Sequence, residues 1–334
     1  MTFAEQHART APATRMTDDS DISLGIDVVV VTIADGEPMI ATTDSSRSGN
    51  ARLPGSRFDT VKIQNLDDGL KSLFGKLGDI DVFEVDQLRT SGFRDQPGKS
   101  DPFKIAIGYL GLTGGGRDMA ASTAGWRSWY DFLPWENRRG PAGDLFAKRA
   151  APLLEDWAKA PECAMDVSIE KSRQARSRAL FAVGGGRFDE ERAPERYRLL
   201  KEAKLVEPMR EALTGPLPGA AENAVKKTAL DGAHLELLAL GVQRLRARLR
   251  HWPIVAGLMP HEFTLFELQR VFEGVLGSDL HKQNFRRFVE TARVLEETGE
   301  LRNHTGGRPA KLFRFNRDVL ANTHGEVSPR FAEI

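Results

Sequence analysis

Cysteine is nearly absent from the sequence, because Cys163 is the only one among 334 residues. A single thiol excludes a disulfide framework and a zinc site made of several cysteines, and it fits a reducing compartment. A long hydrophobic run is also missing, which excludes a membrane-spanning helix. Residues 1–21 lack the apolar stretch of a signal peptide. We therefore expect a disordered tail there and a soluble, cytoplasmic protein.

An excess of charge of one sign is the third absence. The 47 basic residues equal the 47 acidic ones, so the overall charge indicates no class of partner and only local charge is informative. The seven histidines are scattered, with no pair at ligand spacing beside a carboxylate cluster, so we predict no metal site. Length, by contrast, is ample. A chain of 334 residues is long for one compact core, which favours two domains.

The N-terminal part of the chain has the patterns of an α+β domain over about residues 22–118. Residues 26–43 form two apolar runs around Asp35-Gly36, which predicts a β-hairpin. Residues 103–112 predict a buried strand, and leucines at helical spacing predict a helix over 66–80.

A long, mainly helical insertion follows, at about residues 113–230. Its glycine-rich stretches at 113–125 and 183–198 predict loops, and residues 142–160 and 193–213 predict helices. Its aromatic residues predict a packed core, with stacking on an adenine as the alternative (Trp126, Trp129, Tyr130, Phe132, Trp135). From Asp231 a further helix is predicted to lead to Pro253.

The C-terminal region has the order of a winged helix-turn-helix. Thr264 and Glu267 form a capping-box pattern at the start of a helix that Gly277 ends. Asp279 is predicted to cap a second helix. Two short strands follow, joined by a basic, glycine-rich tip in residues 303–315.

Local charge in this region points to nucleic acid. Residues 279–317 hold nine basic and five acidic side chains. A basic helix start suits a major groove, and the helix N-terminus itself attracts phosphate. A solvated helix and an ordinary surface hairpin are the alternative, but order, charge and tip together favour DNA. The predicted DNA-binding residues are Lys282, Gln283, Asn284, Arg286, Arg287, His304, Arg308 and Lys311.

The first domain resembles a Nudix frame, with an LPG turn at 53–55 followed by a helix. An active Nudix box, G-x5-E-x7-R-E-U-x-E-E-x-G-U, holds divalent cations on the glutamates of its helix. With Gly78 as the late glycine, the Arg-Glu pair falls on Lys71-Ser72 and the Glu-Glu pair on Gly75-Lys76. We therefore predict nucleotide binding without hydrolysis. The predicted ligand-binding residues are Arg52, Arg57, Arg94 and Asp95.

Several stretches are similar to the Nudix-related transcriptional regulators of NAD metabolism. They are "VDQLRTSGFRDQPGKSDPFKIAIGYLGL" at 85–112 and, further on, "FTLFELQ", "NFRR" and "GRPAKLFRF". The insertion and the altered Nudix box resemble the NadQ-type subgroup of NAD biosynthesis repressors. The resemblance implies a repressor of NAD biosynthesis or salvage genes, and we predict that it binds a palindromic operator as a homodimer. Its effector would be an adenine nucleotide such as ADP-ribose, NAD or ATP, with no catalytic residue, metal or other cofactor.

These patterns predict a tail at 1–21, a Nudix-like sensing domain at 22–250 and a winged helix-turn-helix domain at 251–334. Two other functions stay open. One is a Nudix-type pyrophosphohydrolase with relocated carboxylates (Asp67, Asp68, Asp79, Asp81, Glu84). The other is a winged domain that docks a protein. Whether the effector tightens or releases DNA is also open.

Overall fold

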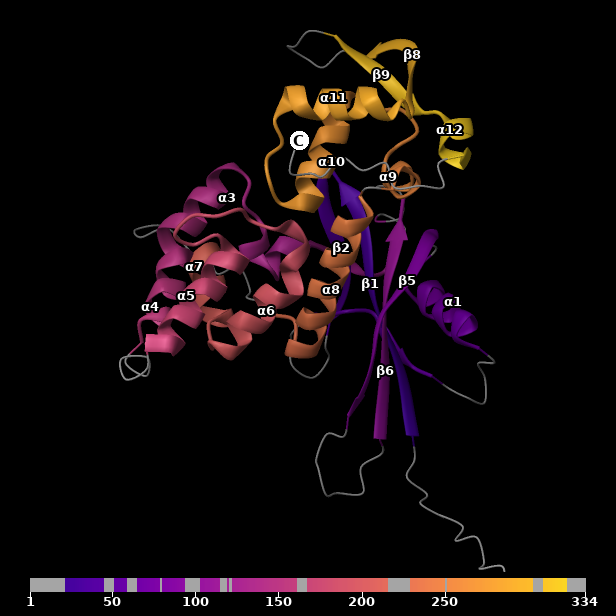
Figure 1. The fold of residues 1–334 in the computed structure, drawn as a ribbon. Coiled ribbons are helices and arrows are strands. Elements are labelled where there is room, and N and C mark those ends of the chain that lie inside the picture. Colours follow the sequence, from indigo (N-terminus) through magenta and orange to yellow (C-terminus); the bar gives the residue numbers. More distant parts are fainter. Residues whose placement is uncertain are drawn as a thin grey trace, which may run out of the picture.

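A computed structural model describes the chain over residues 22–44, 51–58, 65–78, 80–93, 103–114, 119, 122–160, 167–215, 229–249, 251–302 and 309–322. Figure 1 shows a twisted sheet, a block of helices beside it, and the C-terminal helices with a two-stranded ribbon at one end. The predicted α+β class is confirmed. None of the helices in these ranges is long and apolar enough to cross a membrane. Cys163 lies outside the described residues.

The main sheet is mixed and runs in the order β3-β2-β1-β6-β5, with β4 added to β1 and β7 to β2. The strands are β1 (Ile22–Ala34), β2 (Glu37–Asp44), β3 (Ala51–Arg52), β4 (Gly55–Arg57), β5 (Val82–Phe93), β6 (Phe103–Thr113) and β7 (Gly125–Ser128). The predicted hairpin is confirmed, because Ala34 pairs with Glu37 around a turn in which Asp35 and Gly36 have positive φ. β1 and β6 are parallel neighbours at the centre.

Strand β1 is buried on both faces because helices cover both sides of the sheet. Its even-numbered residues Val28 and Val30 pack with α1 (Leu66–Lys76). Its odd-numbered residues Val29 and Val31 belong to the core that includes α8 (Gly232–Arg248). This period-two alternation explains why the sequence shows one unbroken apolar run there. The helix from Asp231 is confirmed, since the Asp231 carboxylate caps α8 through the backbone N–H of His234 at 2.9 Å.

The insertion adds β7 to the sheet and then forms the helical block of Figure 1. Its elements are η1 (Trp129–Asp131), η2 (Pro134–Glu136), α3 (Gly140–Leu145), the π turn η3 (Phe146–Ala150), α4 (Ala151–Ala158), α5 (Val167–Phe181), η5 (Glu190–Arg192), α6 (Ala193–Glu202) and α7 (Val206–Thr214). The predicted single helix at 193–213 is two helices, because the chain turns at Lys204 with φ 57°. Trp129, Phe132 and Trp135 are fully buried, so they pack the insertion as predicted and offer no face to an adenine.

The C-terminal elements are α9 (Trp252–Leu258), α10 (Leu265–Leu276), α11 (Lys282–Ala292), β8 (Leu295–Arg302), β9 (Ala310–Phe315) and α12 (Arg317–Asn322). The Thr264 capping box and the left-handed Gly277 at the end of α10 are confirmed. Trp252 packs against Phe272 and Phe288, at ring-centroid distances of 5.8 and 5.1 Å.

The prediction for Asp279 is wrong. His281 occupies the N-cap of α11 and its side chain makes no capping hydrogen bond. The Asp279 carboxylate instead accepts a hydrogen bond from the backbone N–H of Gly140, at 2.7 Å. The Asp279 side chain therefore makes a tertiary contact with the insertion instead of the local capping hydrogen bond.

Candidate nucleic-acid interface

Helix α11 separates an apolar face from a basic one. Phe285, Phe288 and Val289 are buried against the rest of the C-terminal region. Of the predicted DNA-binding residues on this helix, four are exposed and Asn284 is half-buried (exposed: Lys282, Gln283, Arg286, Arg287). In Figure 1, α11 and the ribbon lie at the end of the molecule, away from most of the sheet and the helical block. The basic face of α11 is therefore open to a partner.

The cations of the strands, unlike those of α11, already have acidic partners. Lys311 pairs with Glu297 at 2.9 Å, and Arg314 pairs with Glu296 at 2.5 Å. Within the part of the chain that the structure describes, Lys282, Arg286 and Arg287 make no ion pair. The uncompensated positive charge of this surface is therefore concentrated on α11.

A groove of about 720 Å³ lies between α11 and the two-stranded ribbon of β8 and β9, the wing. Lys282, Arg286 and Lys311 lie along it, and the exposed side chains of Phe266 and Leu301 contribute apolar surface. The structure thus brings three of the predicted DNA-binding residues together. His304 and Arg308 lie outside the described residues.

The structure describes two of the four predicted ligand-binding residues. Arg94 and Asp95 lie outside the described residues. Arg52 is exposed on β3, opposite Thr43, and Arg57 is exposed on β4, opposite Gly25. Neither arginine makes an ion pair with a described residue. Their role in ligand binding stays a prediction.

The positions matched to the Nudix box lie on the solvent side of α1. Lys71, Ser72, Gly75 and Lys76 are all exposed, while Leu70 and Leu73 face the core. Asp67 and Asp68 precede them by one helical turn on the same side, since residues four apart are neighbours on a helix. Glu84, another candidate for a relocated carboxylate, is hydrogen-bonded to Arg248 of α8. Asp81 is exposed and Asp79 lies outside the described residues.

Sequence patterns gave no sign of a buried ionic cluster beside α10. Glu136, Arg196 and Arg246 have no exposed side-chain surface and come from η2, α6 and α8. Burial alone would raise the pKa of Glu136, but the guanidinium groups of Arg196 and Arg246 outweigh burial and lower it. Only tertiary structure brings these three residues together.

Residues 255–315 match the model of the NrtR DNA-binding winged helix domain. Residues 255–315 form an NrtR-type winged helix domain. A curated relative, the "ADPR responsive transcriptional repressor NtrR" of Acinetobacter baylyi, is 42% identical to this chain over 82 residues. That stretch is 25% of this chain and 32% of the relative, so the chain spans about one third of the relative's length.

Two solved structures are similar over most of the chain. Shewanella oneidensis NrtR complexed with a 27mer DNA is 18% identical, with a TM-score of 0.48, over 89% of this chain and 95% of that one. A MutT/nudix family protein from Enterococcus faecalis is 16% identical, with a TM-score of 0.46, over 89% and 88%. At these identities and TM-scores, the two structures support no conclusion beyond the match of residues 255–315 to the winged helix domain.

Proposed function

We propose that the protein is a DNA-binding transcriptional repressor of NAD biosynthesis genes. In this proposal its first domain is a Nudix-like sensor, catalytically inactive, for an adenine nucleotide of NAD metabolism. The observation that carries the proposal is the NrtR-type winged helix domain whose helix α11 exposes Lys282, Arg286 and Arg287, none of which has an acidic partner among the described residues. The phosphate backbone of DNA attracts cationic side chains that have no acidic partner, and these lie on a helix that can enter a groove of the duplex.

The geometry of α11 supports entry into a major groove. Its basic and amide residues lie in the first two turns, and recognition helices contact base edges from that end. The His281 side chain makes no capping hydrogen bond, so among the described residues no N-cap side chain competes with a phosphate oxygen for the first backbone N–H groups of the helix. We propose that two copies bind a palindromic operator, because two-fold protein symmetry matches two half-sites.

The sensor half of the proposal depends on the Nudix-box positions. Gly75 and Lys76 stand where two metal-binding acids are needed, and the LPG turn is present. A domain that binds a nucleotide but does not cleave it can report on the nucleotide's concentration. The curated relative is named for its response to ADPR, so ADP-ribose is the first effector to test.

A binding assay tests the DNA half directly. Duplexes from the promoter regions next to this gene are titrated with the full chain, and affinity is measured by fluorescence anisotropy. We expect tight, salt-dependent binding to one promoter, which Lys282→Ala weakens. Lys201→Ala is the matched control, because it removes the same charge from an exposed site on α6. Equal weakening by both variants, or no preference for any promoter, would contradict the proposal.

A further inference from the structure

The turn that leads into α11 is attached to the insertion by hydrogen bonds. The hydroxyl of Tyr130 donates to the Gly274 carbonyl oxygen at 2.6 Å, and the backbone N–H of Arg138 donates to the Gly277 carbonyl oxygen at 2.7 Å. The N–H of Gly140 donates to the Asp279 carboxylate, also at 2.7 Å. These contacts cover the last turn of α10 and the residues before α11, while the partners span only residues 130–140.

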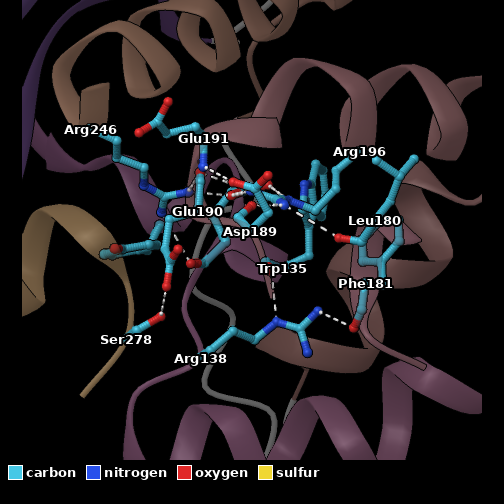
Figure 2. A network of polar contacts seen from close by, with 12 residues as sticks. Trp135, Arg138, Leu180, Phe181, Asp189, Glu190, Glu191, Arg196, Arg246 and Ser278 are labelled. Atoms are coloured by element: carbon cyan, nitrogen blue, oxygen red, sulfur yellow. Dashed lines mark hydrogen bonds and ion pairs between the residues drawn. The ribbon is translucent and has the colours of Figure 1, made fainter. Parts of the chain in front are cut away.

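The buried ionic cluster adjoins this turn, and Figure 2 labels its residues Arg196 and Arg246 together with Ser278 of the turn. Arg196 makes two hydrogen bonds to the Glu136 carboxylate, each 2.7 Å long. Arg246 donates to the same carboxylate at 2.6 Å and, through Nε, to the Val275 carbonyl oxygen at 2.8 Å. Arg246 therefore connects Glu136 to the C-terminal end of α10.

The cluster contains two buried cations and one buried anion, and backbone carbonyl groups offset the difference. Arg196 donates to the carbonyl oxygens of Leu180 and Asp189, and Arg246 donates to that of Glu190. Val275 and Leu180 lie at the C-terminal ends of α10 and α5, where the helix dipole favours positive charge. Charge that is paired and hydrogen-bonded in this way fixes geometry closely, because any displacement leaves a buried group without a partner.

Gly277 shows how closely the two parts fit. Its φ is +75°, and a Cβ added there would lie 2.2 Å from the carbonyl oxygen of Glu136. The turn can therefore approach the insertion only with a glycine at this position. The Ser278 hydroxyl also donates to the Glu190 carboxylate, at 3.3 Å.

We propose that the insertion positions helix α11 for DNA, with Glu136, Arg246 and Asp279 as positioning residues. The observed arrangement is one that DNA can use, because it leaves Lys282, Arg286 and Arg287 exposed and the insertion on the other side of the turn. The inference rests on the proposed DNA-binding function. It assigns a role in operator binding to a part of the chain that lies outside the winged helix domain.

Asp279 gives the sharpest test, because its hydrogen bond can be separated from its charge. Asp279→Ala and Asp279→Asn remove the same negative charge near the DNA, but the asparagine keeps a side-chain oxygen that accepts from Gly140. We expect Asp279→Ala to bind the operator about tenfold more weakly than Asp279→Asn, within the range of typical coupling between sites. Equal affinity of the two variants would overturn the proposal.

Gly277→Ala is a second, independent test, and Gly184→Ala is its control. Gly184 has a φ of +72°, but a Cβ there would meet only Arg178 at an ordinary 3.7 Å. Both alanines would adopt a similar positive φ, and only the one at position 277 would collide with Glu136. We expect operator affinity to fall in Gly277→Ala and to stay near that of the wild type in Gly184→Ala.

Far-ultraviolet circular dichroism and thermal unfolding establish that each variant is folded, and the Asp279 pair decides the matter if Gly277→Ala does not fold. Wild-type affinity in folded Gly277→Ala would count against the proposal. A wild-type chain that binds no promoter would instead show that the proposed function itself is wrong.

Discussion

The cations on the surface proposed to face DNA differ in whether a phosphate group would have to displace an acidic partner. Arg286 and Arg287 have no acidic partner among the described residues, whereas Lys311 is already paired with Glu297. A phosphate contact by Lys311 therefore replaces an existing ion pair, and exposed pairs of this kind contribute only about 0–1 kcal/mol. The difference is small for stability but measurable in salt dependence.

We expect Arg286→Ala and Arg287→Ala each to reduce the slope of log affinity against log salt concentration by about 0.9, the value for one lost phosphate contact. Lys311→Ala should reduce it less, because Glu297 already compensates part of that charge. Operator titrations between about 50 and 200 mM salt, over which the Debye length falls by about half, give the slopes. An unchanged slope for both arginine variants would mean that α11 does not meet the phosphate backbone.

The buried carboxyl of Glu136 predicts a pH dependence of stability. Arg196 and Arg246 outweigh burial and hold its folded-state pKa below the ordinary value. A carboxyl group with a lowered folded-state pKa stabilises the fold above its unfolded pKa, about 4.3, and this stabilisation is lost as pH falls toward the folded pKa. At neutral pH, Glu136→Gln should cost roughly 3–5 kcal/mol, because it leaves two buried arginines without an anion.

Thermal unfolding of the wild type and Glu136→Gln at several pH values measures this effect. We expect the difference in melting temperature to be large at pH 7 and to shrink below about pH 4. Glu202→Gln is the control, since Glu202 forms a comparable pair with Arg176 at the surface and should matter little. A difference that stays constant with pH would show that Glu136 acts through its shape alone.

At the scale of single elements, helix α1 tests the alternative of an enzyme. Its exposed side carries Ser72, Gly75 and Lys76 at the positions where the Nudix box of a metal-dependent hydrolase has glutamates. We expect no cleavage of ADP-ribose or NAD with Mg²⁺ or Mn²⁺, as measured by chromatography of the products. Metal-dependent cleavage that Asp68→Asn abolishes, but Asp81→Asn does not, would show that the carboxylate one turn earlier has taken over the role.

Elements specified by neighbouring residues were predictable from the sequence. The hairpin at Asp35-Gly36 and helix α10 were found because turn and capping signals lie within four residues of the feature they specify. The true role of Asp279 was missed because its partner Gly140 is 139 residues away. The break at Lys204 was missed for a related reason: helical spacing continued through it, and the packing of α6 and α7 is tertiary.

The candidate site was predictable to the same extent. The basic residues of α11 form a pattern within one helix, so their shared exposed face could be deduced from helical periodicity. The pairing of Lys311 with Glu297 could not be deduced, because it depends on the register of β8 with β9. The cluster of Glu136, Arg196 and Arg246 depends on three separate elements and has no local pattern at all.

For the whole molecule, helix α8 offers a route from the proposed sensor domain to the winged helix domain. Arg244 pairs with Asp86 of β5 at 2.6 Å, and Arg89 of β5 pairs with Glu236 at 3.0 Å. The same helix contributes Arg246, which holds the end of α10. A ligand that favours one position of α8 would therefore also change the orientation of α11, provided that it binds the two states unequally.

We expect ADP-ribose to release the operator, with a change in affinity of about 5- to 150-fold. Parallel titrations with NAD, ATP and nicotinamide mononucleotide in the anisotropy assay identify the preferred effector. Arg244→Ala should reduce the response and leave ligand binding intact, which isothermal calorimetry can verify. Intact operator binding that none of the four nucleotides changes would contradict the sensor half of the proposed function.

The cluster around Glu136 has a consequence for how the protein is made. During translation, Glu136 is synthesised 110 residues before Arg246, its partner on α8. At about 5–20 residues per second, the carboxylate waits on the order of ten seconds for that arginine. During this interval the insertion holds an acidic side chain that has no complete site to enter. A nascent chain arrested before residue 246 should therefore be cleaved by proteases within the insertion, and one arrested after the winged helix domain should resist.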